Sequence, residues 1–266
     1  MGININTVST DSFEMDYFRF GEGSVPFVII PGLSLLSVMI SSDAVAKQYE
    51  DMAKDYDIYV FDRRKVIPPQ YSIRDMASDT ACAIQSLGLK DICLFGASMG
   101  GMISMMIAID HPELVSRLVL GSVPVKTADL SAEFDNWIRL AEERDSLSLC
   151  MSFGEAIYPH EVFEQYKGAF ASMAELATDV DLDRFVKLAK GAEGFDVTLD
   201  LCRIKCPVLA ISSADDRIVD PTSSARIAAG VFMNEHSRSF MYDDCGHAAY
   251  DIAPDYRVRI MEFLNT

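Results

Sequence analysis

The sequence predicts an α/β protein with a mostly parallel central sheet flanked by helices. Short apolar runs that are typical of strands alternate with longer segments of helical periodicity, and this alternation is the signature of βαβ units. Runs such as "FVII" and "PVLAI" are apolar at consecutive positions, which indicates strands covered on both faces. One long interval, residues 122–200, breaks the alternation because all of its patterns are helical.

Seven short runs are predicted to be strands, on their apolar and β-branched content. They are Phe13–Phe20, Phe27–Ile30, Ile58–Phe61, Ile92–Phe95, Leu118–Leu120, Val208–Ser212 and Ser239–Tyr242. Five segments between and after them have helical periodicity. They are Asp43–Lys54, Ile73–Leu87, Met99–Ile109, Thr222–Phe232 and Asp255–Leu264. Ser72, followed three residues later by Asp75, provides an approximate capping box for the second helix.

Residues 122–200 are predicted to form a helical cap, inserted into a core made of residues 1–121 and 201–266. The interval contains "LSAEFDNWIRLAEERDSLSLCM", "EVFEQYKGAFASMAELA" and "LDRFVKLAKGA", and a structureless loop of this length is implausible in a compact domain. A row of ordinary crossover helices is the alternative. The insertion is favoured because strand-like runs resume only at Val208.

Composition narrows the class of partner. The 266 residues are half hydrophobic, which suits one large domain with an insertion. The net charge of −17, more than half of it contributed by the 16 acidic and 7 basic residues of the insertion, argues against nucleic acid and anionic membranes. Neither a membrane span nor a secretory signal is recognisable in the sequence. We therefore expect a small-molecule substrate, and the sequence does not indicate the oligomeric state.

The six cysteines do not predict a disulfide framework or a metal site. Cys82 and Cys93 lie in apolar stretches, where free cysteine behaves as a small hydrophobe. Cys202 and Cys206 have no second Cys/His pair at ligand spacing. We expect a reduced, cytoplasmic protein without metal or cofactor.

The stretch "ICLFGASMGGMISMMIAI", residues 92–109, contains the candidate nucleophile. Gly96-Ala97-Ser98-Met99-Gly100 has the G-x-S-x-G form of a strained strand-to-helix turn that exposes a serine hydroxyl. A dinucleotide fingerprint would need glycine where Ser98 stands, and a phosphate loop would need a G-K-[S/T] ending. An unreactive turn of small residues is the remaining alternative.

Serine needs a base, and the base needs an orienting acid. Among the four histidines, His247 in "YDDCGHAAYD" follows the last predicted strand, at the carboxyl end of the sheet where catalytic groups gather. His111 lies roughly 15 Å from Ser98 along the helix, His160 lies inside the insertion, and His236 precedes the last strand. His247 is therefore the predicted base.

The acid is expected after the preceding strand, in "ADDRIVDP". Asp215, Asp216 and Asp220 all qualify by position. Asp216 is our choice and Asp215 the reserve, because a carboxylate that orients imidazole must stay ionised with the help of loop N–H donors.

Two backbone N–H groups are expected to bind the oxyanion of an acyl-transfer reaction. The first belongs to Met99, directly after the nucleophile. The second is that of Leu33 in "FVIIPGLSLLS", where Gly32 lets the chain turn toward Ser98. A simple Pro-Gly turn is the alternative for this loop.

Taken together, the chain resembles the α/β-hydrolase superfamily nearly end to end. The resemblance rests on "VIIPGLS", "VFDRR", "SIRDMASDTACAIQSLGL", "LFGASMGGMISMMIAIDHPELVSRLVLGS", "CPVLAISSADDRIVDP" and "CGHAAYD". Its sequence motifs are most similar to those of small capped hydrolases, which include carboxylesterases, lysophospholipase-like enzymes, carbon–carbon bond hydrolases and proline iminopeptidases. The resemblance implies nucleophile Ser98, acid Asp216, base His247, oxyanion donors Leu33 and Met99, and a cap after the sixth strand.

Two features depart from the family's usual pattern. The oxyanion loop begins Pro31-Gly32 where the family usually has His-Gly, and "KVIPPQY" replaces a Gly-rich turn after "DRR". Backbone donors do not depend on the first difference, and the second concerns the pocket rim. A serine at position 98 argues against the dehalogenases and epoxide hydrolases of this fold, which use aspartate.

The predicted function is a serine hydrolase that cleaves a small, apolar carboxylic ester, thioester or amide through an acyl-enzyme. The alternatives are a ligand-binding receptor or pseudo-enzyme on the same scaffold, and cofactor-free perhydrolysis or carbon–carbon hydrolysis. Aromatic and methionine side chains that face the cleft would suit an apolar acyl or aryl group. The candidates are Phe134, Trp137, Phe153, Phe163, Phe170, Met102, Met105 and Met106.

Overall fold

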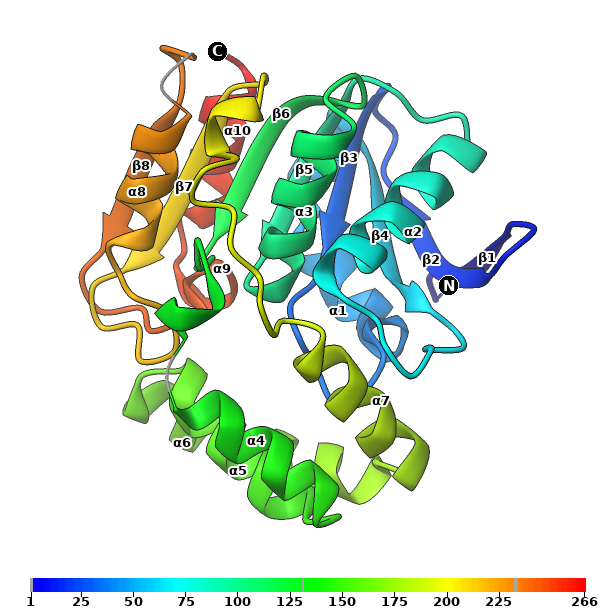
Figure 1. The fold of residues 1–266 in the computed structure, drawn as a ribbon, viewed down its shortest axis with the longest axis vertical. Helices are drawn as coiled ribbons and strands as arrows, with labels where there is room; N and C mark the ends of the chain where they lie inside the picture. The colour runs from blue at the N-terminus through cyan, green and yellow to red at the C-terminus, as the bar shows by residue number, and fades with distance from the viewer. Residues whose placement is uncertain (1, 131, 232–233) are drawn as a thin grey trace.

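The computed structural model describes residues 2–130, 132–231 and 234–266, and its centre is an eight-stranded sheet (Figure 1). The strands are β1 (Ile5–Ser9), β2 (Glu14–Phe20), β3 (Val25–Ile30), β4 (Tyr56–Arg64), β5 (Ile92–Ala97), β6 (Val115–Gly121), β7 (Val208–Ser213) and β8 (Arg238–Tyr242). Their order is β1-β2-β4-β3-β5-β6-β7-β8. The pairs β1–β2 and β2–β4 are antiparallel and the remaining pairs are parallel. The predicted fold class is therefore confirmed.

The sheet is covered on both faces, as the continuous apolar strands predict. Alternate residues of β3 point to opposite faces: Val28 and Ile30 belong to a core shared with α2 and α3. Phe27 and Ile29 belong to the other core, with α10. The helices outside the insertion are α1 (Ser42–Gln48), α2 (Ile73–Ser86), α3 (Met99–Asp110), α8 (Ser223–Gly230), α9 (Ala249–Ile252) and α10 (Tyr256–Leu264).

Between β6 and β7 the described residues form four α-helices, which we call the cap helices. They are α4 (Glu133–Glu142), α5 (Ser146–Ile157), α6 (His160–Leu176) and α7 (Asp179–Lys190). Figure 1 shows them gathered beyond one end of the sheet, where α5 packs on α6 and α4 on α7. The first helical pattern of the insertion is two helices because Arg144 has a φ of 63°. Asp145 then caps α5 by accepting a hydrogen bond from the Ser148 N–H at 3.0 Å.

Several element boundaries differ from the sequence prediction. The edge strand β1 was not expected. The predicted helix 43–54 ends at Gln48 and resumes as a 3₁₀ turn at Met52–Lys54, because the buried Tyr49 leaves helical geometry to pack on Phe27, with ring centroids 6.4 Å apart. Helix α8 ends at Gly230, and the predicted last residue, Phe232, lies outside the described residues.

The predicted capping box of α2 is present. The Ser72 hydroxyl accepts from the Asp75 N–H at 3.2 Å, and the Asp75 carboxylate accepts from the Ser72 N–H at 2.9 Å. These bonds satisfy two of the backbone donors that the first helical turn leaves free. In the described ranges, no helix is sufficiently long and apolar to cross a membrane.

Candidate active site

Ser98 occupies the sharp turn between β5 and α3, with φ 52° and ψ −122°. Its N–H donates to the Gly121 carbonyl on β6 at 2.8 Å. The two glycines of the motif are required by space. A Cβ on Gly96 would stand 2.4 Å from the Gly100 carbonyl oxygen, and a Cβ on Gly100 would stand 2.0 Å from that of Ile30. The motif therefore packs the turn tightly against neighbouring backbone while the serine is held in a region that side chains rarely adopt.

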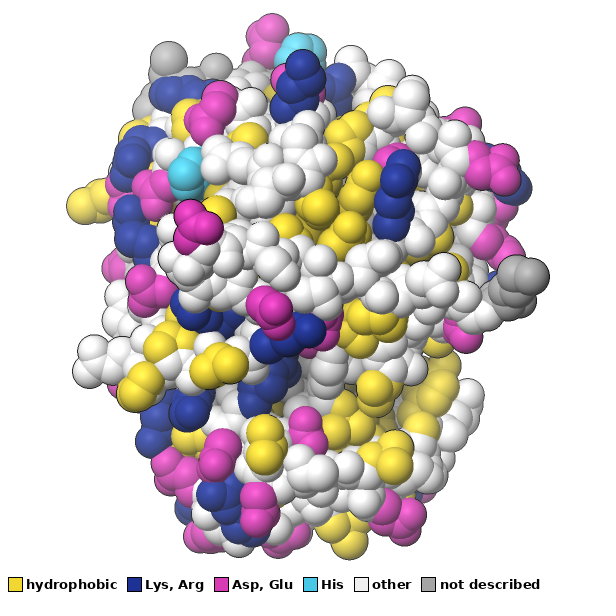
Figure 2. Space-filling model, turned by 90° about the vertical axis from the view of Figure 1, so that its right-hand side faces the viewer, with side chains coloured by type: hydrophobic (Ala, Val, Ile, Leu, Met, Phe, Trp, Pro, Cys, Tyr) yellow, Lys and Arg dark blue, Asp and Glu magenta, His cyan; other side chains and the backbone are white. Residues whose placement is uncertain are grey.

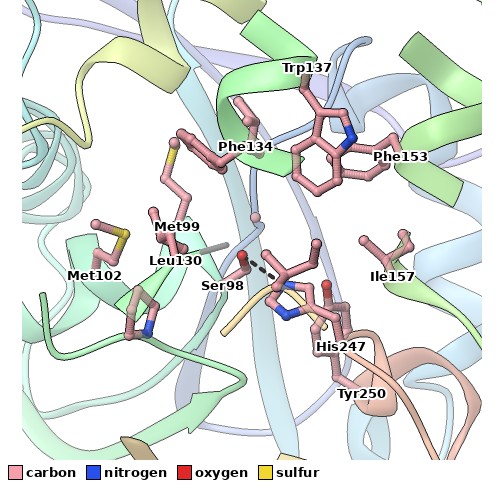
Figure 3. A pocket seen from close by; sticks show the side chains of 14 residues that line it. Ser98, Met99, Met102, Leu130, Phe134, Trp137, Phe153, Ile157, His247 and Tyr250 are labelled. Atoms are coloured by element: carbon pink, nitrogen blue, oxygen red, sulfur yellow. Dashed lines mark hydrogen bonds between the residues drawn. The ribbon is translucent and has the colours of Figure 1, made fainter. Parts of the chain in front are cut away.

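The structure brings together the three predicted triad side chains. His247 Nε2 lies 2.9 Å from Ser98 Oγ (Figure 3). On the other side of the ring, His247 Nδ1 lies 2.9 Å from Asp216 Oδ2. The side chains of His247 and Asp216 are 3% and 1% exposed. Ser98 follows β5, Asp216 follows β7 and His247 follows β8, so all three lie at the carboxyl ends of parallel strands.

The two neighbouring aspartates have separate partners. Asp216 Oδ1 accepts the N–H groups of Ile218 at 2.8 Å and Val219 at 3.0 Å, and these two bonds hold the carboxylate in place beside the imidazole. Asp215 Oδ1 instead accepts from Ser213 Oγ at 2.6 Å and the Gly246 N–H at 2.8 Å. Asp215 therefore joins the loops after β7 and β8, and Asp216 is the carboxylate that contacts imidazole.

The two predicted oxyanion donors, Leu33 and Met99, lie on either side of Ser98. Met99 is the first residue of α3, so its N–H has no acceptor within the helix and lies at the positive end of the helix dipole. Leu33 lines the same cavity as Ser98. The loop before it approaches closely, since a Cβ on Gly32 would lie 3.3 Å from Ser98 Cβ. Both predicted residues are thus beside the serine hydroxyl.

The structure adds one group that sequence reasoning missed. Arg63, at the carboxyl end of β4, is buried and donates from Nη2 to the Pro31 carbonyl at 2.6 Å. Burial lowers the pKa of Arg63 to about 10, so this side chain remains a cation at neutral pH. Its hydrogen bond to Pro31 fixes the loop that contains Gly32 and Leu33. Beside Arg63, Asp62 pairs with Arg184 of α7 and accepts from Ser37 Oγ at 2.5 Å. The "DRR" run after a buried strand was the available signal.

A small cavity of about 20 Å³ lies over the triad, room for roughly one water molecule. Figure 3 shows Phe134, Trp137 and Phe153 of the cap helices on the side opposite His247 and Tyr250. Of the eight aromatic and methionine candidates, these three and Met102 line the cavity. The other four, Phe163, Phe170, Met105 and Met106, do not line this cavity. Ser98 Oγ therefore faces a mainly apolar enclosure.

The cap helices also contact the loops that contain Asp216 and His247. Arg217, next to Asp216, donates to the Tyr158 carbonyl at 3.0 Å and to that of Glu155. The Ala248 N–H, next to His247, donates to the Ile157 carbonyl at 3.0 Å. These carbonyls belong to the end of α5, which leaves its last C=O groups without helical partners. The end of α5 is thus bonded to both loops.

The remaining histidines lie where the sequence predicts. His111 is the C-cap of α3, with Nδ1 3.6 Å from Glu113, and His160 begins α6. His236 precedes β8. The part of the chain that the structure describes has no cluster of three or more His, Cys, Asp or Glu side chains that could hold a metal ion.

Comparisons with known proteins agree with this architecture. A curated relative in Agrobacterium fabrum, named "Putative carbamate hydrolase RutD", is 26% identical over 82% of this chain and 86% of its own length. The protein of that name in Pseudomonas syringae is 28% identical over 81% and 86%.

Solved structures share the fold. The enol-lactonase from Burkholderia xenovorans superposes with a TM-score of 0.83 at 16% identity, covering 98% of this chain and 100% of the other. An esterase from Exiguobacterium antarcticum gives 0.79 at 20% identity, with both chains covered completely. The alpha/beta hydrolase fold family matches residues 25–254, and the chain belongs to this family.

Proposed function

We propose that the protein is a serine hydrolase that cleaves a small, apolar carboxylic ester, thioester or amide through an acyl-enzyme. The observation that carries the proposal is the continuous hydrogen-bonded row from Ser98 Oγ through His247 to Asp216, with contacts of 2.9 Å on both sides of the imidazole. This is the arrangement that makes a serine hydroxyl nucleophilic.

In the acylation step, Ser98 Oγ attacks the substrate carbonyl while His247 Nε2 takes its proton. Asp216 holds Nδ1–H and stabilises the imidazolium that forms. The oxyanion accepts hydrogen bonds from the N–H groups of Leu33 and Met99. His247 then returns the proton to the leaving group, and the carbonyl–leaving-group bond breaks.

In the deacylation step, water replaces the leaving group. Water attacks the acyl carbonyl while His247 takes a proton from it. The N–H groups of Leu33 and Met99 bind the oxyanion that forms in this second step. Proton return to Ser98 Oγ releases the carboxylic acid.

The cavity walls support an apolar substrate. Phe134, Trp137 and Phe153 contribute rings and Met102 a flexible thioether, and such side chains bind hydrocarbon groups of varied shape. We assign residues 122–200 as the cap, because α5 meets the loops of Asp216 and His247. Substrate entry into so small a cavity requires either a compact acyl group or movement of the cap side chains.

Hydrolysis of a carbamate is the second candidate. This candidate is supported by the two relatives named "Putative carbamate hydrolase RutD". Their similarity extends over more than 80% of this chain and of their own lengths. The chemistry differs from ester cleavage only in the nitrogen attached to the attacked carbonyl, so the same serine, base and oxyanion donors would serve.

Fluorophosphonate labelling tests the proposal against the receptor and pseudo-enzyme alternatives. We expect the wild-type protein to label and to hydrolyse p-nitrophenyl acetate, and Ser98→Ala to do neither, with a loss of several orders of magnitude in turnover. Retained hydrolysis in Ser98→Ala would refute the assignment. Parallel rates on simple carbamates and on a vinylogous diketone rank carbamate and carbon–carbon hydrolysis against ester cleavage.

A further inference from the structure

A second cavity lies within the cap, apart from the one over the triad. It measures about 70 Å³, larger than the 20 Å³ at Ser98, and we call it the rear chamber. Three cap helices and the oxyanion-loop segment form it: Leu35 comes from the loop, Cys150 and Phe153 from α5, Phe170 and Met173 from α6, and Phe185 from α7.

Phe153 lines both cavities. Its ring packs against Trp137 with centroids 4.6 Å apart, and both rings face the cavity over Ser98 (Figure 3). The ring of Phe153 is therefore the shared wall between the triad cavity and the rear chamber. A change of the Phe153 side-chain rotamer is the movement that we expect to join the two spaces.

The rear chamber is suited to hydrocarbon. All the residues that line it are uncharged, and the only hydroxyl among them, Ser34 Oγ, already donates to the Leu36 carbonyl at 2.8 Å. Burial raises the pKa of the Cys150 thiol to about 11, so this wall is neutral at physiological pH. A polar or charged group placed there would lose its hydration without gaining partners.

The position of the rear chamber indicates whether the acyl group or the leaving group of the substrate can enter it. Its loop wall, Ser34 and Leu35, directly follows Leu33, the donor we place at the carbonyl oxygen. A leaving group must instead stay near His247 Nε2 to receive its proton. The group that remains on Ser98 after the leaving group departs is therefore the one that can extend past Phe153.

We propose that the rear chamber binds the hydrocarbon end of the substrate's acyl chain, and that Phe153 sets how long that chain can be. The inference rests on the proposed function and narrows its substrate class to carboxylic esters with a short-to-medium, uncharged acyl chain. Each methylene that enters an apolar site should raise kcat/KM about fourfold, until the chamber is full.

The test compares p-nitrophenyl esters of acetate, butyrate, hexanoate, octanoate and decanoate. We expect the wild-type preference to rise from acetate to an intermediate length and then fall. Cys150→Leu and Met173→Phe, which fill the chamber from two different helices, should lower hexanoate turnover about tenfold and change acetate turnover less than threefold. Phe153→Ala, which removes the wall, should move the optimum to a longer chain.

Phe195→Ala is the matched control, since Phe195 is a buried phenylalanine of the same insertion that lines neither cavity. It should keep the wild-type order of chain lengths. A second series uses acetate esters of alcohols of increasing chain length. Cys150→Leu and Met173→Phe should not change the turnover of these esters.

Equal effects of the filling variants on acetate and hexanoate, or effects confined to the alcohol series, would overturn the acyl assignment while leaving the hydrolase in place. A wild-type protein that neither labels with fluorophosphonate nor turns over any of these esters would overturn the proposed function itself, and the chamber assignment with it.

Discussion

Ser98, the proposed nucleophile, has a strained backbone conformation. Its φ of 52° and ψ of −122° are unfavourable for a side chain by about 1–3 kcal/mol but suit glycine, whose mirror-image regions are open. The neighbouring strand and helix hold the turn in place through the tightly packed Gly96 and Gly100. Exposure of the hydroxyl thus comes at the expense of stability.

Substituting Ser98 separates this strain from the chemistry. Ser98→Ala and Ser98→Gly both remove the hydroxyl and should both be inactive. Ser98→Gly should be the more stable of the two by about 1 kcal/mol in urea denaturation, because relief of strain exceeds the conformational entropy that glycine loses on folding. At Ser78, an exposed position within α2, the same pair should show the opposite order. A Ser98→Gly protein less stable than Ser98→Ala would contradict strain at this turn.

The two adjacent aspartates should respond differently to the same change. Asp216→Asn should lower kcat about ten-thousandfold, because an amide no longer secures the imidazole tautomer that accepts the serine proton. Asp215→Asn keeps an oxygen to accept from Ser213 Oγ and the Gly246 N–H, so its kcat/KM should stay within tenfold of the wild type. Initial rates on p-nitrophenyl acetate decide the matter, and the reverse order would exchange the two roles.

For single residues of the candidate site, the sequence predicts which residue types occur, and in which order along the chain, better than it predicts which residues they contact. Ser98 and His247 follow from a glycine motif and from position after a strand. The choice between Asp215 and Asp216 depends on which carboxylate meets the imidazole and the loop N–H groups, which no local pattern encodes. Arg63 was missed for the same reason, since its partner is a carbonyl 32 residues away.

Among the elements, strands covered on both faces were the easiest to predict. Strand β5 is buried along its whole length, and a continuous apolar run indicates such a strand. Strand β1 gives no comparable signal, because it is antiparallel at the sheet edge and only Val8 of its five residues is buried. The break at Arg144 was equally hidden, since "RLAEERDSLS" keeps helical propensity across the turn.

Helix α7 is joined to the core by an ion pair that should contribute measurably to stability. Arg184 and Asp62 are only 16% and 14% exposed, so removing one partner leaves a poorly hydrated charge. We expect Arg184→Met and Asp62→Asn each to lower the free energy of unfolding by about 2 kcal/mol, with a coupling energy of about 1 kcal/mol in the double variant.

The exposed pair Arg139–Glu143 on α4 is the control for this cycle. Its N–O distance is 2.6 Å, but its side chains are 55% and 54% exposed, and such pairs are worth about 0.5 kcal/mol or less. Urea denaturation of both cycles gives the comparison. Equal coupling energies would show that burial does not strengthen the α7 contact.

Across the whole molecule the charge of −17 is unevenly shared between core and cap. Residues 122–200 hold 16 acidic and 7 basic side chains, and Phe134, Trp137 and Phe153 from this interval line the cavity over Ser98. Figure 2 shows one face of the molecule, on which Lys and Arg side chains lie among the acidic ones. The net negative charge of residues 122–200 produces an electric field around the molecule. Such a field acts on a charged substrate during approach, more than on the chemistry after binding.

A pair of matched esters should reveal this field. The acetate ester of 4-hydroxybenzoate carries a carboxylate on the leaving group, and its methyl ester has the same acyl group without the charge. Raising the ionic strength from about 0.01 M to 0.15 M shortens the Debye length from about 30 Å to 8 Å. We therefore expect kcat/KM for the anionic ester to rise severalfold and that for the neutral ester to stay constant. An equal response of the two esters would mean that the acidic cap does not influence access to Ser98.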